Sequence, residues 1–166
     1  IYIQAVYDTL IKRDPDGTLV PMLATEWSYD DARTSLSLTL RDDVTFTDGT
    51  KFTGDVVKAN LERFRDASAI QSATMADLKE VEVVDETHVV LHLTQPNPAF
   101  EVYLSDIAGF MQSPEAFEGD ALKTEPVGSG PYTFDRGASV VGSEYVFERN
   151  EDYWGEPLPF EELHIK

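Results

Sequence analysis

The feature that most restricts the fold is an alternation of apolar and polar side chains that starts at residue 35. Leu36, Leu38 and Leu40 are separated by single serine and threonine residues, and Val44 and Phe46 continue the alternation. Successive side chains of a β-strand point to opposite faces of the sheet. The pattern therefore predicts a strand with one buried face and one face in water.

Other periodic segments surround this strand. Val81 and Val83, and then Val89 and Leu91, alternate with polar residues on either side of a turn, which predicts a β-hairpin. Helices are predicted over residues 3–11, 53–64, 99–104 and 113–122, further strands over 132–134, 143–149 and 160–166, and an irregular segment over 19–27. Since strands outnumber helices and hairpins dominate, the predicted fold class is α+β with an antiparallel or mixed sheet.

Composition excludes several classes of function. The 166 residues suffice for one domain or two small subdomains, and no apolar run reaches the length of a membrane span. With 13 basic and 31 acidic residues the net charge is -18, which disfavours nucleic acid and anionic membranes as partners. Scattered acidic residues are typical of a solvated surface, and a halophilic or cation-attracting role is the alternative. Because the chain has no cysteine, it can form no disulfide, thiolate metal site or cysteine nucleophile.

No constellation typical of an enzyme stands out. His88 and His92 share a strand face, but four residues of strand separate them by about 13 Å, too far to bind one metal ion. The Gly128-Ser129-Gly130 segment lacks both the nucleophile-elbow spacing and the phosphate-loop lysine. It is read as a tight turn in which glycine permits close backbone approach and whose N–H groups could also meet a ligand. We therefore predict no catalytic residue, no metal site and no cofactor.

Taken in order, the motifs resemble the extracytoplasmic solute-binding proteins of ABC importers, in the peptide/nickel-binding class (family 5). The matching segments are residues 6–10, 14–27, 38–50, 53–57, 83–93, 95–100, 127–132 and 148–155. They include a glycine-proline-aromatic loop and an asparagine-tyrosine-tryptophan turn. Gly54 departs from the family, which usually has a better helix former at the start of this helix.

The resemblance implies a periplasmic-binding-protein-like lobe with an accessory subdomain, truncated from a two-lobed protein. Residues 1–12 and 114–166 are expected to form part of the main lobe, and residues 13–113 the accessory subdomain. In the family the lobes close over a solute and the closed form docks on the permease, so no enzyme activity is implied. The N-terminal residues contain no signal, and we expect the chain to start inside a mature domain. The implied location is extracytoplasmic: the periplasm, or the cell surface as a lipid-anchored lipoprotein in a Gram-positive host.

Candidate ligand-binding residues follow from their expected position in the first lobe. They are Gln71, Ser105, Asp106, Gly109, Gly128, Ser129 and Gly130, and for each a purely structural role is an equal alternative. The expected partners are a small-molecule or oligopeptide ligand and the ABC permease subunits, with self-association of the truncated fragment also expected. Nickel chelates, opines and oligosaccharides are alternative ligands. A sensor or regulator domain with the same fold, or a hydrolase, is the alternative function.

Overall fold

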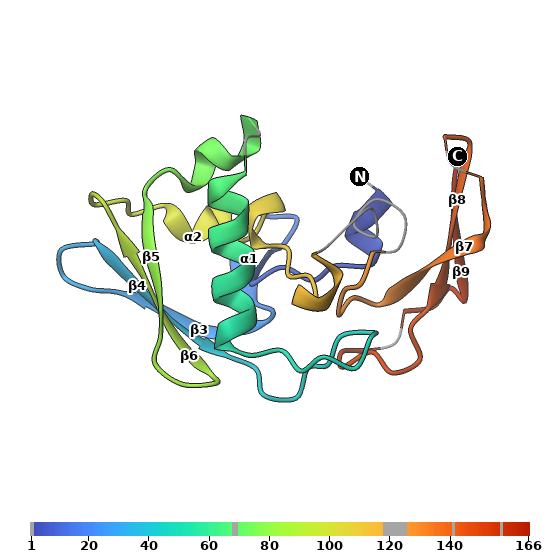
Figure 1. Cartoon of the computed structure of the whole chain (residues 1–166), viewed down its shortest axis with the longest axis horizontal. Coiled ribbons are helices and arrows are strands. Elements are labelled where there is room, and N and C mark those ends of the chain that lie inside the picture. The colour runs from blue at the N-terminus through green and yellow to red at the C-terminus, as the bar shows by residue number, and fades with distance from the viewer. Residues whose placement is uncertain (1, 68–69, 118–125, 141, 157) are drawn as a thin grey trace. The chain divides into compact units, whose positions relative to one another are not determined.

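The computed structural model describes residues 2–67, 70–117, 126–140, 142–156 and 158–166 (Figure 1). The chain divides into two compact units. Unit 1 comprises Ile1–Asp8, Asp43–Lys51 and Gln112–Lys166, and unit 2 comprises Thr9–Asp42 and Phe52–Met111. Among the described residues, no helix has the length and apolar content needed to cross a membrane.

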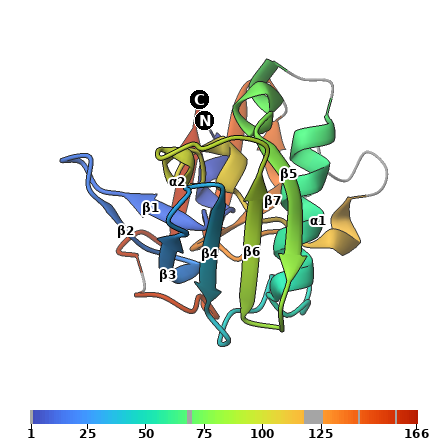
Figure 2. The ribbon, with the colours of Figure 1, turned by 90° about the vertical axis from the view of Figure 1, so that its left-hand side faces the viewer.

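Unit 2 is built on one antiparallel sheet. Its strands are β3 (Ala24–Tyr29), β4 (Ser35–Leu40), β6 (His88–Leu93) and β5 (Leu78–Val83), in that spatial order. Helix α1 (Gly54–Asp66) packs against β5, and Figure 2 shows it beside that end of the sheet. A small hairpin of β1 (Ile11–Arg13) and β2 (Leu19–Pro21) and the short helix α2 (Phe100–Tyr103) complete the unit.

The predicted alternation in β4 is confirmed, and it faces the core of unit 2. Leu36, Leu38 and Leu40 are all buried. Leu36 pairs with Leu91 of β6, and Leu38 pairs with Val89, so apolar side chains of neighbouring strands lie on the same face. Cross-strand pairs of this kind stabilise a sheet and fix its register, because a shift by one residue would turn every leucine toward water.

Unit 1 contains a three-stranded antiparallel sheet and several turns. The sheet has the order β7 (Tyr132–Val140), β8 (Glu144–Arg149) and β9 (Glu162–Ile165), and 3-10 turns occur at Tyr2–Ala5 and Pro114–Ala116. Phe147 of β8 is fully buried and its ring lies 5.5 Å from that of Phe134 on β7. An apolar cluster thus forms on one face of this sheet.

Residues 43–51 lie in unit 1, although the predicted boundaries put them inside the accessory range 13–113. The amide of Thr47 donates to the carbonyl oxygen of Gly128 at an N···O distance of 3.0 Å, which is typical of a backbone hydrogen bond. The hydroxyl of Ser113 donates to that of Thr50 at 3.2 Å. These bonds to the later part of the chain hold the segment there. That the two units are a main lobe and an accessory subdomain stays a prediction.

Three predicted elements differ from the structure. The helix over residues 3–11 is wrong, because only Tyr2–Ala5 forms a 3-10 turn and Ile11 already begins β1. The irregular segment over 19–27 is also wrong, since it contains β2 and most of β3, with an irregularity in the register between Ala24 and Glu26. Of the helix predicted over 113–122, the structure shows the turn Pro114–Ala116, while residues 118–125 lie outside the described part.

The glycine at the start of α1 fits its position closely. A β-carbon on Gly54 would lie 2.8 Å from the carbonyl oxygen of Asp85 and 3.0 Å from side-chain carbons of Val83 and Val89. The Gly54 amide also donates to the carbonyl of Glu86 at 2.8 Å. The helix therefore begins directly against the β5–β6 turn, and a better helix former has no room there.

Replacing Gly54 by alanine is expected to destabilise the protein by up to about 2 kcal/mol. Alanine gains about 1 kcal/mol in helix propensity over glycine, but overpacking against a backbone carbonyl costs about 1–3 kcal/mol. Urea unfolding followed by circular dichroism measures the balance. A variant more stable than the wild type would show that the β5–β6 turn yields and that propensity decides at this position.

Candidate functional site

One carboxylate of unit 1 is buried. Asp8 has a relative exposure of 2% and follows two buried residues, Val6 and Tyr7. Its oxygen Oδ2 accepts hydrogen bonds from the Ser129 hydroxyl at 2.9 Å and from the Trp154 indole nitrogen at 2.8 Å. Its other oxygen, Oδ1, accepts from the Tyr153 hydroxyl at 3.3 Å. A single carboxylate therefore joins the N-terminal segment to two distant parts of the chain.

The glycine loop can approach the segment that contains Asp8 because Gly128 and Gly130 have no side chains. The amide of Gly130 donates to the carbonyl oxygen of Val6 at 2.8 Å. A β-carbon on Gly128 would lie 2.0 Å from the same oxygen, and one on Gly130 would lie 2.6 Å from it. Since only glycine tolerates such an approach, the loop lies directly on the N-terminal segment and places Ser129 over Asp8.

The turn that follows β8 supplies the two aromatic partners. The side-chain amide of Asn150 donates to the carbonyl of Gly130 at 3.1 Å, and its backbone amide donates to the carbonyl of Pro131 at 2.8 Å. The Tyr153 amide closes the turn on the carbonyl of Asn150 at 3.2 Å. Asn150 thus fixes the turn to the glycine loop, and the rings of Tyr153 and Trp154, 5.2 Å apart, extend to Asp8.

Burial changes the acidity of Asp8. Desolvation disfavours the charged form and raises the pKa of Asp8 to about 6, although the hydrogen bonds from Trp154, Ser129 and Tyr153 favour the charged form and oppose this rise. Tyr153 is the titratable group among these partners, and no charged side chain contributes to the shift. At neutral pH Asp8 is therefore mostly ionised, buried, and held by neutral donors alone.

The candidate residues of unit 2 lie on two neighbouring turns. Gln71 is exposed on the 3-10 turn Ile70–Met75, which packs against the turn Ile107–Gly109. Asp106 is exposed and caps the second turn by accepting from the Ile107 amide at 2.8 Å. The structure therefore brings Gln71 and Asp106 onto one region of unit 2.

The same region exposes apolar side chains and holds a constrained glycine. Ile70 is 92% exposed and Ile107 is 41% exposed. Gly109 is buried, and a β-carbon there would lie 1.8 Å from the carbonyl oxygen of Leu104, so the turn requires glycine. The Ser105 hydroxyl donates to the carbonyl of Val102 at 2.7 Å, which commits its proton to the local backbone. Gln71 and Asp106 are therefore the exposed residues of this group, whereas Ser105 is half-buried.

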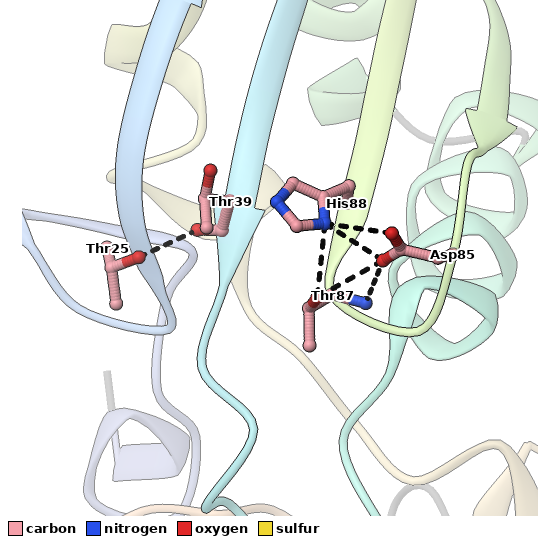
Figure 3. A network of polar contacts seen from close by, with 5 residues as sticks. All are labelled: Thr25, Thr39, Asp85, Thr87 and His88. Atoms are coloured by element: carbon pink, nitrogen blue, oxygen red, sulfur yellow. Dashed lines mark hydrogen bonds and ion pairs between the residues drawn. The ribbon is translucent and has the colours of Figure 1, made fainter.

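The histidines have carboxylate partners of their own. Figure 3 shows His88 beside Asp85 and Thr87. The ring nitrogen Nδ1 of His88 lies 2.9 Å from an oxygen of Asp85. This interaction is the main reason that the pKa of Asp85 is lowered to about 2. On the same strand, His92 Nε2 lies 2.7 Å from an oxygen of Glu82. Within the described ranges, no group of three or more histidine and acidic residues is arranged to hold a metal ion.

Asp8 lies in the matching segment of residues 6–10, but the sequence alone predicts no role for it. The available signal is a single acidic residue in a segment whose apolar residues Val6, Tyr7, Leu10 and Ile11 surround it. The glycine loop is a predicted ligand contact. In the structure Ser129 of this loop binds Asp8 and has an exposure of 1%. Contact of this loop with a ligand stays a prediction.

A comparison with protein families identifies the chain. Residues 18–166 match the family model described as bacterial extracellular solute-binding proteins, family 5 Middle. The chain belongs to this family. The expected resemblance is thereby confirmed, and the similar solved structures confirm the periplasmic-binding-protein-like fold.

Individual relatives agree with the family match. The chain is 34% identical over 161 residues to the glutathione-binding protein GsiB of Escherichia coli K12, which covers 94% of this chain and 31% of GsiB. Among solved structures it is similar to NikZ of Campylobacter jejuni, in complex with Ni(L-His), with 30% identity and a TM-score of 0.90 over 99% of this chain and 34% of NikZ. An ABC transporter substrate-binding protein from Sinorhizobium meliloti has 35% identity and a TM-score of 0.85, covering 98% of this chain and 34% of that protein. The chain thus spans about a third of the length of these relatives.

Proposed function

We propose that this chain is part of the first lobe of the solute-binding component of an ABC importer, and that the whole protein captures a peptide or similar small solute. The family match over residues 18–166 carries this proposal. The solute would be enclosed between two lobes outside the cytoplasmic membrane and delivered to the permease. The protein then acts by reversible binding, and no chemical conversion of the solute is proposed.

The chemistry of unit 2 favours a solute derived from amino acids. Asp106 presents an exposed carboxylate, which attracts the ammonium group of a peptide. Gln71 presents an amide that can donate and accept hydrogen bonds, as peptide backbones do, and Ile70 presents apolar surface. A peptide-like solute matches all three, and the 34% identity to a glutathione-binding protein makes glutathione the first solute to test.

Native mass spectrometry of the whole protein, purified without denaturation, tests the proposal. The expected result is an added mass of several hundred daltons that is released on unfolding and fragments as a peptide. Titration of the unloaded protein with glutathione, followed by calorimetry, then gives its affinity. Loss of glutathione with time would instead support a hydrolase, and absence of binding to glutathione and dipeptides would direct the search to nickel chelates, opines and sugars.

A substitution at Asp106 tests whether unit 2 contributes to ligand binding. Asp106→Asn keeps an oxygen that can cap the turn, but it removes the charge. We expect its affinity for a peptide ligand to fall at least about tenfold, because a hydrogen bond to a charged group contributes about 1.5–3 kcal/mol. Asp31→Asn, at another exposed aspartate of unit 2, is the matched control and should bind as the wild type does. Equal affinity of both variants would remove Asp106 from the site.

A further inference from the structure

Stability does not explain why the chain has an acid at position 8. Asp8 is 2% exposed, and burial opposes its ionisation more strongly than its three hydrogen bonds favour it. Burying a charge is costly, and replacing even a buried ion pair by well-packed apolar residues of similar volume is often neutral or stabilising. The carboxylate is therefore expected to serve a purpose other than folding stability.

The three partners of Asp8 differ in what they can donate and accept. The Trp154 indole can only donate, whereas the hydroxyls of Ser129 and Tyr153 can donate or accept. A neutral group at position 8 can keep Ser129 and Trp154 on one oxygen and donate to the hydroxyl oxygen of Tyr153 from the other side. Charge is thus not needed to satisfy these groups, but it makes the hydrogen bonds about twice as strong.

Two segments are held by these bonds. Ser129 lies in the glycine loop, and Tyr153 and Trp154 lie in the turn after β8, so one carboxylate fixes both to the N-terminal segment. We propose that ionised Asp8 is a positioning residue that holds the loop of residues 128–130 and the turn of residues 150–155 in the geometry that ligand binding requires. The part that concerns the ligand rests on the proposed function and on the predicted contact of the glycine loop with the solute.

Hydrogen exchange of the whole protein tests the positioning role without any ligand. The probes are the amides of Gly130, Asn150 and Tyr153, each of which donates a backbone hydrogen bond in the loop or turn. At pH 8 we expect Asp8→Asn to exchange these amides at least tenfold faster than the wild type, while amides within β8 are unchanged. Asp152→Asn changes an exposed acid of the same turn and should leave all rates unaltered.

The wild type supplies a second test that does not depend on the variant's folding. At pH 5 Asp8 is mostly protonated, so the same amides should exchange faster than at pH 8 after correction for the intrinsic pH dependence of exchange. Unchanged rates in the loop and turn in both comparisons would overturn the positioning role. A uniform rise throughout unit 1 would also overturn it, because it would show only a loss of overall stability.

Affinity for glutathione, measured by calorimetry at pH 8, tests the part that concerns the ligand. We expect Asp8→Asn to bind about tenfold more weakly although its fold is retained. If the wild type binds neither glutathione nor dipeptides, the peptide class of the proposed function fails, while the exchange result still decides whether Asp8 positions the two segments. If the wild type binds glutathione and Asp8→Asn binds it equally well, the role in ligand binding is overturned.

Discussion

Replacing Gly128 by alanine is expected to lower the free energy of unfolding by about 3 kcal/mol or more. The new β-carbon would lie 2.0 Å from the carbonyl oxygen of Val6, 2.8 Å from its carbonyl carbon and 2.7 Å from the ring of Tyr7. The first two are backbone atoms, and the same carbonyl oxygen accepts the Gly130 amide. The clash can therefore be relieved only by moving the loop off the N-terminal segment.

Urea unfolding followed by circular dichroism measures this loss, and Gly137→Ala is its matched control. Gly137 lies in β7 of the same unit, and a β-carbon there would approach only the side-chain oxygen of Asp135, at 3.3 Å. A flexible side chain can give way, so the control should be as stable as the wild type or slightly more stable, since alanine loses less backbone entropy than glycine on folding. Equal stability of the two variants would contradict the close approach of loop and N-terminal segment.

The parts of the fold that the sequence predicted correctly are those with a short local period. β4, the β5–β6 hairpin and α1 each bury one face, so the order of apolar and polar residues directly reports the period of the backbone. In α1, Val57 and Leu61 lie on the buried face. Such local patterns can be interpreted without knowing which element packs against the buried face.

The predictions of secondary structure fail where the buried residues follow no regular spacing. Val6, Leu10 and Ile11 have spacings typical of a helix, but Tyr7 and Asp8 between them are buried as well, so the segment is enclosed on every side. A fully buried segment gives no alternation from which helix and extended chain could be distinguished. The position of residues 43–51 was missed for a related reason, because it depends on hydrogen bonds to residues more than 60 positions later, such as Thr50 to Ser113.

The candidate site, like the fold, could be predicted from the sequence only in part. The glycine loop and the asparagine-tyrosine-tryptophan turn were recognised as motifs, because each is a short contiguous string. Their common partner Asp8 precedes Ser129 by 121 positions and Trp154 by 146 positions, and no local pattern connects them. Only the fold shows that these three segments form one cluster, and only its burial shows that the acid is unusual.

Burial of Asp8 predicts an unusual dependence of stability on pH. Its pKa rises from 3.8 to about 6 in the folded protein, so between these values the folded state binds a proton that the unfolded state has released. Stability from this group is therefore complete below about pH 4, falls as pH rises, and is lost above about pH 6. The total loss is about 3 kcal/mol, because each pKa unit corresponds to about 1.4 kcal/mol.

Asp8→Asn isolates this contribution, since an amide does not titrate in this range. Exposed acids such as Asp85, whose pKa is lowered to about 2, act in the opposite direction at low pH, but they are present in both proteins and cancel in the difference. We expect the variant to gain about 3 kcal/mol relative to the wild type between pH 4 and pH 8, measured by urea unfolding at several pH values. A difference that does not change with pH would mean that Asp8 ionises as it does in the unfolded chain, and that the cluster is open to water. A gain that develops between about pH 4 and pH 6 and stays constant at higher pH, together with faster exchange in the loop and turn, would show that the charge weakens the fold while it orders the two segments.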